Sequence, residues 1–359
     1  MAWQIDVVSS QGATLETLDT CGGFSLVRTL NAVGSFTLRH GLDRSLLVPD
    51  HRFLFKRDKS LELVGFLRRW RLDGTGMTLS GPDQNVLLKR RLVAYYAGTT
   101  QAQKSAAADD LIKEIIAENL GASATDTDRD LTAAGLTVQG DLSQGPTVDK
   151  SFAYANVLRI FQEAADVARS NDSEIYFAVV PTSDTDFQFR TWTGQWGRDR
   201  RETLTLSEEM GNLTDVVVEE DYSSEVNFVY AGGQGEESAR VVVEVWDPAR
   251  LAYPWGRCEA FADARQATTT GEVEDVGRAA LLEGRPRLKF AATLLDCAGA
   301  RYGVDWNFGE RVRASAYDQE FDCLVRTVKI DVDAKGNETI TARLECDLPL
   351  GQAVQVNAW

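Results

Sequence analysis

Apolar and polar residues alternate in short runs through the first 95 residues of this chain. The runs cover residues 3–8, 24–27, 35–39, 52–57 and 61–67, and the pattern continues through 70–80. A period of two is typical of strands with one buried face, and the intervening glycines mark turns. Strands this short and closely spaced predict a β-barrel or a β-sandwich.

The middle of the chain changes to helical spacing. Apolar residues fall on one helical face at 106–120, where Gly121 is the expected C-terminal stop. Apolar residues between 152 and 165 predict a second amphipathic helix, which is expected to end near 170–172. Residues 121–146 are rich in Gly, Ser, Thr and Asp and are predicted to form a loop. Strands are expected again at 174–180 and 186–192.

The last third returns to strand-like runs. Strands are expected at 213–219, 225–230, 241–245, 287–295, 311–316, 323–332 and 338–346, with one helix at 273–282. The β-branched run 241–245 is expected to pair with 226–231, and residues 333–337 are expected to form a hairpin turn.

These patterns predict a mainly β protein with an α+β middle, in which two β-barrel domains flank helix-containing insertions. The expected domains are residues 1–98 for the first barrel, 99–215 for the α+β middle and 216–359 for the second barrel with its one helix. Part of the middle domain can return to the first barrel.

Charge is spread unevenly along the chain. The formal net charge of −16 divides into +4 for residues 1–95, −14 for 96–235 and −6 for 236–359. Tight nucleic-acid binding requires Lys and Arg to neutralise many phosphates, so the acidic balance argues against it. The acidic middle is either a solvated surface or one that lines a passage or meets a basic partner.

Catalytic and metal-binding constellations are hard to find. The two histidines, His40 and His51, are expected at the surface or an interface, which leaves little room for His-based catalysis. The acidic run 126–130 resembles the start of a calcium loop, but Leu131 and Thr137 replace the required Gly and Glu. We therefore predict no catalytic residues, no cofactor and no metal.

Three other motifs have plain structural interpretations. The Gly-rich run 232–235, followed by Glu236 and Glu237, precedes a strand and lacks a Lys-Ser/Thr pair. A hairpin with a bulge is therefore favoured over a phosphate loop. Acidic pairs would serve a glycosidase only if two carboxylates converged, which a sequence does not reveal. The basic runs 89–91 and 198–201 are expected to form interface or loop ion pairs.

Tryptophan and cysteine usage adds two expectations. Six of the eight tryptophans lie in the second half, where they either pack in cores or anchor a subunit interface. The five cysteines include no CxxC pair and are expected to be reduced and mostly buried. We expect no membrane-spanning segment, because no run is apolar over about 20 residues, and no secretory signal at the N-terminus.

Three stretches, in order along the chain, resemble the siphovirus ReqiPepy-type tail protein family. The first has Gly-Phe-Ser-Leu-Val-Arg at 23–28 and Gly-Ser-Phe-Thr-Leu at 34–38. The second includes Leu-Ser-Glu-Glu-Met-Gly-Asn-Leu at 206–213, and the third Asn-Phe-Val-Tyr-Ala-Gly-Gly-Gln-Gly-Glu at 227–236. The resemblance runs from about residue 15 to about residue 345.

The resemblance implies a phage baseplate hub, a structural protein of the tail tip rather than an enzyme. Such hubs are homotrimers whose chains each supply two tube-like β-barrels, so that six barrels join a sixfold tail tube to a threefold tip. It also implies a virion protein assembled in the host cytoplasm. The implied partners are the distal tail protein, the tail tube and tape-measure proteins and a tail fibre or spike.

The same resemblance implies a channel through which DNA passes without specific binding. An acidic wall would suit that channel because it repels DNA. The acidic excess is then expected to face the lumen or solvent, and the basic first 95 residues to lie against neighbouring subunits. The alternatives are a hub-associated cell-wall hydrolase using a carboxylate pair and a tail protein that binds a receptor or carbohydrate through exposed tryptophans.

Overall fold

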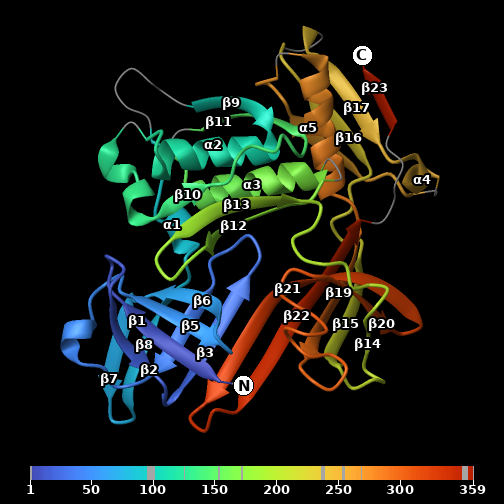
Figure 1. Cartoon of the computed structure of the whole chain (residues 1–359). Coiled ribbons are helices and arrows are strands. Elements are labelled where there is room, and N and C mark those ends of the chain that lie inside the picture. Colours follow the sequence, from blue (N-terminus) through green and yellow to red (C-terminus); the bar gives the residue numbers. More distant parts are fainter. Residues whose placement is uncertain are drawn as a thin grey trace. The chain divides into compact units, whose positions relative to one another are not determined.

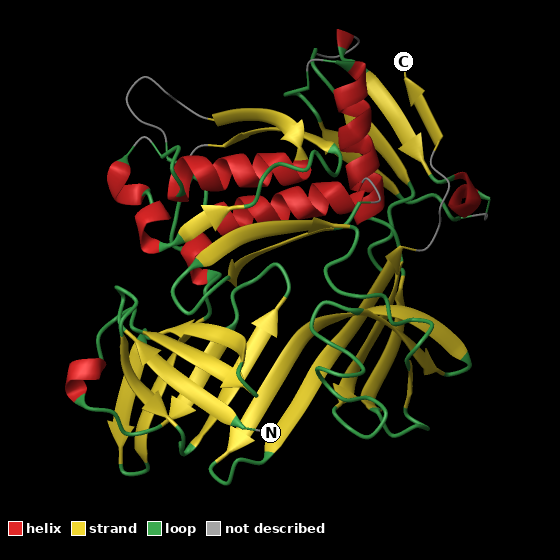
Figure 2. Cartoon of the chain, in the orientation of Figure 1, coloured by secondary structure: helices red, strands yellow, loops and turns green. Residues whose placement is uncertain are grey.

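The computed structural model describes residues 2–94, 102–124, 126–152, 154–170, 173–235, 239–252, 255–267, 269–349 and 355–358. Strands predominate, as Figure 2 shows. The chain divides into two compact units, of which unit 1 is Met1–Thr214 with Thr293–Leu344 and unit 2 is Asp215–Ala292 with Glu345–Trp359. Three strands carry the chain from one unit to the other: β15 (Leu213–Asp221), β19 (Arg287–Leu295) and β22 (Glu338–Pro349).

Unit 1 contains most of the other strands and most of the helices. Its strands are β1 (Trp3–Val8), β2 (Thr14–Leu18), β3 (Gly23–Thr29), β4 (Ser35–Arg39), β5 (Arg52–Arg57), β6 (Ser60–Phe66), β7 (Arg69–Asp73), β8 (Gly76–Pro82), β9 (Ala102–Ala107), β10 (Leu136–Val138), β11 (Thr147–Phe152), β12 (Ile175–Pro181), β13 (Phe187–Thr193), β14 (Thr205–Ser207), β20 (Arg311–Ala316) and β21 (Gln319–Asp333). Its α-helices are α1 (Val86–Lys89), α2 (Ala108–Leu120) and α3 (Val157–Ser170), and its 3₁₀ turns are η1 (Arg44–Leu46), η2 (Thr127–Arg129) and η3 (Thr132–Ala134).

Two sheets of unit 1 pack face to face. One has the order β2-β1-β5-β6, and the other contains β3, β4 and β8 side by side. Alternation points Phe36 of one sheet toward Phe53 of the other, with ring centroids 5.4 Å apart. The sheets approach closely because Gly65 has no side chain: a Cβ there would lie 2.2 Å from the Phe36 ring. The packing is therefore that of a sandwich.

The prediction of closed β-barrels is wrong. Within the described residues the sheets are open, because β3 pairs with β4 and β21 rather than closing onto the four-stranded sheet. A single bridge, Gly65 to Asp83, joins the two layers where a closed barrel would have a ladder. The mainly β composition of the prediction is confirmed, and face-to-face packing replaces closure.

Helices α2 and α3 of unit 1 pack against the three-stranded sheet β10-β13-β12, as Figure 1 shows. Helices α2 and α3 share a core with Leu54 and Val64, which point away from the facing β3-β4-β8 strands. Helix α2 ends at Leu120 with Gly121 as its C-cap, as the sequence predicts. The loop predicted at 121–146 is wrong at one point, because Leu136–Val138 forms β10 and pairs in parallel with β13. Three residues are too few for a period of two to stand out.

Unit 2 is a four-stranded sheet with a helix on one face. The strands β16 (Phe228–Gly232), β17 (Val242–Trp246), β18 (Glu259–Asp263) and β23 (Gln355–Ala358) have the order β18-β16-β17-β23, and the helices are α4 (Pro248–Leu251) and α5 (Thr270–Glu283). A capping box of Thr269 and Glu272 starts α5. The antiparallel pair β16–β17 confirms the predicted partnership of 226–231 with 241–245.

Candidate assembly surface

The candidate site is formed by the two end strands of the largest sheet. Eight of its strands follow the order β15-β19-β22-β21-β3-β4-β8-β7 (Figure 1). The long antiparallel contact of β21 with β3 brings the two ends of the chain into one sheet, with Thr327 opposite Thr29. The run ends at β7 on one side and at β15 on the other. An end strand leaves a row of backbone N–H and C=O groups available to another chain.

Strand β7 is exposed along its whole length. All five of its residues are exposed, and it pairs with β8 on one side, Trp70 opposite Leu79 and Arg71 opposite Thr78. Leu72 is 64% exposed although it lies on the side of the sheet that carries core residues further in. The Arg44 guanidinium lies 5.6 Å from the centroid of the Trp70 ring. This strand thus combines an apolar side with a basic one.

Strand β15 differs from β7 in charge. Asp215 has a positive φ of 54°, and the alternation of buried and exposed side chains along β15 starts anew after it. From there Val216 and Val218 are half-buried while Val217 and Glu219 are exposed. The strand ends in the acidic run Glu219-Glu220-Asp221, and one cation approaches it, the Lys289 ammonium at 4.0 Å from the Asp221 carboxylate. Within the described residues β15 has β19 as its only neighbour in the sheet.

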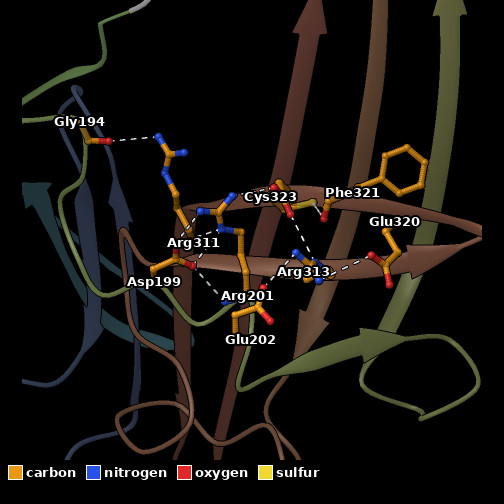
Figure 3. A network of polar contacts seen from close by, with 10 residues as sticks. Gly194, Asp199, Arg201, Glu202, Arg311, Arg313, Glu320, Phe321 and Cys323 are labelled. Carbon is orange, nitrogen blue, oxygen red and sulfur yellow. Dashed lines mark hydrogen bonds and ion pairs between the residues drawn. The ribbon is translucent and has the colours of Figure 1, made fainter.

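The basic run 198–201 forms ion pairs, as the sequence predicts. Arg201 donates two parallel hydrogen bonds to Asp199, Nε to Oδ1 at 2.9 Å and Nη2 to Oδ2 at 2.6 Å (Figure 3). Its Nη1 also donates to Asp322 Oδ2 at 2.6 Å. Arg313 adds contacts to Glu202 and Asp322. Hydrogen bonds from Arg201 lower the pKa of Asp199 to about 2. The network fixes the chain before β14 to strands β20 and β21.

The other residues singled out in the sequence do not converge on one site. The described residues contain no cluster of three or more His, Cys, Asp or Glu that could hold a metal ion. His51 is buried, contrary to expectation, because its ring turns inward and its Nδ1 lies 3.0 Å from the Leu46 carbonyl oxygen. In the basic run 89–91, Arg90 forms an ion pair with Asp50 at 2.7 Å. Glu236 and Glu237 lie outside the described residues.

Tryptophans and cysteines divide between buried and exposed places. Trp306 is fully buried, and Trp192 stacks on Trp196 with ring centroids 3.8 Å apart. Trp255 is fully exposed.

The expectation of mostly buried cysteines is wrong for Cys21, Cys258 and Cys297, which are half-buried because they lie in connections outside the named strands. None of the helices in the described part of the chain is long and apolar enough to cross a membrane.

Comparison with known families decides the kind of protein. The model of the siphovirus ReqiPepy6 Gp37-like protein family matches residues 4–344. The chain belongs to this family. The resemblance carried by the three sequence stretches is thus confirmed across nearly the whole chain. No curated protein matches significantly.

Solved structures of phage tail proteins have the same fold as this family member. The tail protein from Neisseria meningitidis MC58 matches with a TM-score of 0.58 at 13% identity, covering 96% of this chain and 97% of that one. The prophage MuSo2 43 kDa tail protein from Shewanella oneidensis matches with a TM-score of 0.59 at 10% identity, covering 96% and 97%. Prophage tail protein gp18 from Listeria monocytogenes EGD-e gives 0.56 at 12% identity, covering 96% and 94%. By family and fold the chain is a structural protein of the phage tail type.

Proposed function

We propose that this protein is the hub of a phage tail tip, a homotrimeric ring that joins a sixfold tail tube to a threefold tip and works without catalysis. The observation that carries the proposal is the pair of unlike end strands, β7 and β15, on one sheet. In the virion the ring would contact the tail tube, distal tail and tape-measure proteins and a fibre or spike, and its lumen would pass DNA. Family membership supports the tail assignment.

The side chains of the two end strands are complementary in a head-to-tail arrangement. Pairing β7 of one copy with β15 of the next would set Trp70 and Leu72 beside Val216 and Val218 on one face. On the other face it would set Arg71 near Glu219, an opposite-charge cross-strand pair. The basic N-terminal part would then lie against a neighbouring subunit.

Pairing of like edges is disfavoured on the same grounds. A twofold pair of β15 strands is antiparallel, and a pairing centred on Glu220 would bring the Glu219, Glu220 and Asp221 carboxylates of the two copies together. Like charges opposite each other destabilise a sheet. A head-to-tail contact is heterologous, and heterologous contacts close into rings when the rotation per subunit allows it. Unlike edges therefore favour a cyclic assembly over a twofold dimer.

Disulfide trapping tests the proposed contact. Leu72→Cys and Val218→Cys in one chain should give covalent oligomers under mild oxidation, with a trimer as the largest closed species in native mass spectrometry. The matched control is Leu72→Cys with Val304→Cys, since Val304 is also a valine and is exposed, at 63%, but does not belong to an end strand of the sheet. Covalent oligomers in the control alone would contradict the ring. A protein that stays monomeric under all conditions, including within mature phage particles, would also contradict it.

A further inference from the structure

Three strands at the β7 end of the sheet share an exposed, donor-rich face. The pairing sets Thr37, Ser80 and Arg69 in one row across β4, β8 and β7. It sets Arg39, Thr78 and Arg71 in the next row. Because side chains alternate along a strand, all six project from the same face, away from the core. They line a hollow of about 280 Å³ together with Asp73 and Thr75.

The positive charge of this hollow is not neutralised within the described residues. Arg71 forms an ion pair with the Asp73 carboxylate at 3.1 Å. Arg39 and Arg69 have no ion-pair or hydrogen-bond partner for their side chains among the described residues. Asp73 is the only acidic residue of the hollow, and hydrogen bonds from Thr75 lower its pKa, with Arg71 and Arg39 contributing less. Two guanidinium groups and three hydroxyls therefore retain unused donors.

Neighbouring strands add two acids to this face, and both have partners of their own. Asp333 of β21 lies in the row of Arg39, across Gly23, and its carboxylate accepts hydrogen bonds from Lys335 and Asn337. Ser25 of β3 lies beside Thr37, and the next residue in that row, Asp331 of β21, accepts an ion pair from Lys329 at 2.7 Å. A donor surface of this composition suits a tetrahedral oxyanion, because a phosphate offers several acceptor oxygens and Arg, Ser and Thr are its usual protein contacts. A single carboxylate would satisfy fewer of these donors.

We propose that the hollow formed by Arg39, Arg69, Thr37, Thr78 and Ser80 binds a phosphate group of the duplex DNA backbone. The hollow lies within unit 1 of a single chain, although a ring contact would bring Glu219 of a neighbouring copy to Arg71 at its edge. Its role in a DNA conduit rests on the proposed function. If this face lines the channel, basic residues contact the passing DNA at this level. Basic residues on the channel wall would contradict the acidic wall that we expected from the overall charge.

The test is binding of the full chain to a short fluorescent duplex at low ionic strength, followed by anisotropy. The double variant R39Q/R69Q should weaken binding roughly tenfold, about the effect of one charge-assisted hydrogen bond. It should also reduce the slope of log affinity against log salt by about 1, because one phosphate is no longer neutralised. The control R265Q/R278Q removes the same formal charge from exposed sites of unit 2 and should leave both values nearly unchanged.

Two further probes decide the source of the phosphate. Inorganic phosphate should compete only weakly, because it lacks the neighbouring charges of a duplex, and polyglutamate should not compete at equal charge. Equal losses in R39Q/R69Q and in the control would overturn the site, since net charge alone would then govern binding. Strong binding of inorganic phosphate without DNA binding, or competition by polyglutamate equal to that of DNA, would overturn the DNA assignment. Circular dichroism of both variants checks that they fold, and the disulfide trapping experiment is unaffected by either result.

Discussion

Two arginine-rich places on unit 1 use the same residue type in opposite ways. Around Asp199 and Asp322, the guanidinium groups of Arg201 and Arg313 are held by carboxylates (Figure 3). At the β7 end of the sheet, Arg39 and Arg69 face a hollow with no such partner in the described structure. In the first place the guanidinium N–H groups bind carboxylates and hold strands together. In the second place they remain available to a ligand. The presence or absence of carboxylate partners thus distinguishes a structural arginine cluster from a binding surface.

The buried ion pair of α2 is the extreme case of the paired class, and disrupting it should have the largest effect. Lys113 and Asp109 are 1% and 0% exposed, with Nζ 3.0 Å from Oδ2. Asp109→Ala leaves a buried ammonium with only the Gly140 carbonyl oxygen, which should cost about 3–5 kcal/mol.

Urea unfolding followed by circular dichroism measures that loss. The control Glu274→Ala breaks the Arg278–Glu274 pair, which has the same i,i+4 spacing on an exposed helix face, and should cost no more than about 0.5 kcal/mol. Equal losses for the two variants would mean that burial does not set the value of pairing here.

Asp83 is an acid without an ion pair, and its titration should run opposite to that of Asp199. Burial raises the pKa of Asp83 to about 6, although the backbone N–H of Asn85 donates to it. Its ionised form is disfavoured in the folded state, so stability should fall as pH rises from about 4 to about 6 and then level off. Two pKa units correspond to about 2–3 kcal/mol.

The comparison of wild type with Asp83→Asn isolates this dependence. The variant does not ionise at this position, so the difference in unfolding free energy between the two proteins should change over that pH window and stay constant above it. Asp199, whose pKa is lowered, should instead stabilise the fold above about pH 4 and lose that contribution as pH falls toward 2. A flat difference for Asp83→Asn between pH 4 and 6 would contradict the assignment.

The surface network of Figure 3 should contribute less than either buried group. Asp322 is 44% exposed and contacts Arg201 at 2.6 Å and Arg313 at 3.5 Å. Asp322→Ala should cost about 1 kcal/mol or less, because solvent screens exposed pairs, and the loss should shrink at high salt. Thermal unfolding at two ionic strengths measures it. A loss that salt does not change would indicate that Asp322 acts through packing instead.

Local structure followed from the sequence, but the candidate surface did not. The turn at 333–337 is present, with the Asp333 carboxylate accepting the backbone N–H of Lys335 and Asn337, because its Asp, Gly and Asn residues carry the signal themselves. Strand order carries no such signal. The pairing of Thr29 with Thr327 joins residues 298 positions apart, so nothing local indicates that β7 and β15 become the ends of one sheet. Alternation alone likewise could not separate a closed barrel from two packed sheets.

The smallest expected effect belongs to the unpaired arginines and is the sharpest check of the comparison. Arg69→Gln removes no hydrogen bond or ion pair seen in the described structure and relieves some repulsion from Arg39 and Arg71. The unfolding free energy should therefore change by no more than about 0.5 kcal/mol. Arg201→Gln, which breaks the contacts to Asp199 and Asp322, should destabilise more when measured in parallel by urea unfolding. A loss above about 1 kcal/mol for Arg69→Gln would place this arginine among the structural ones and leave the hollow without its unused donors.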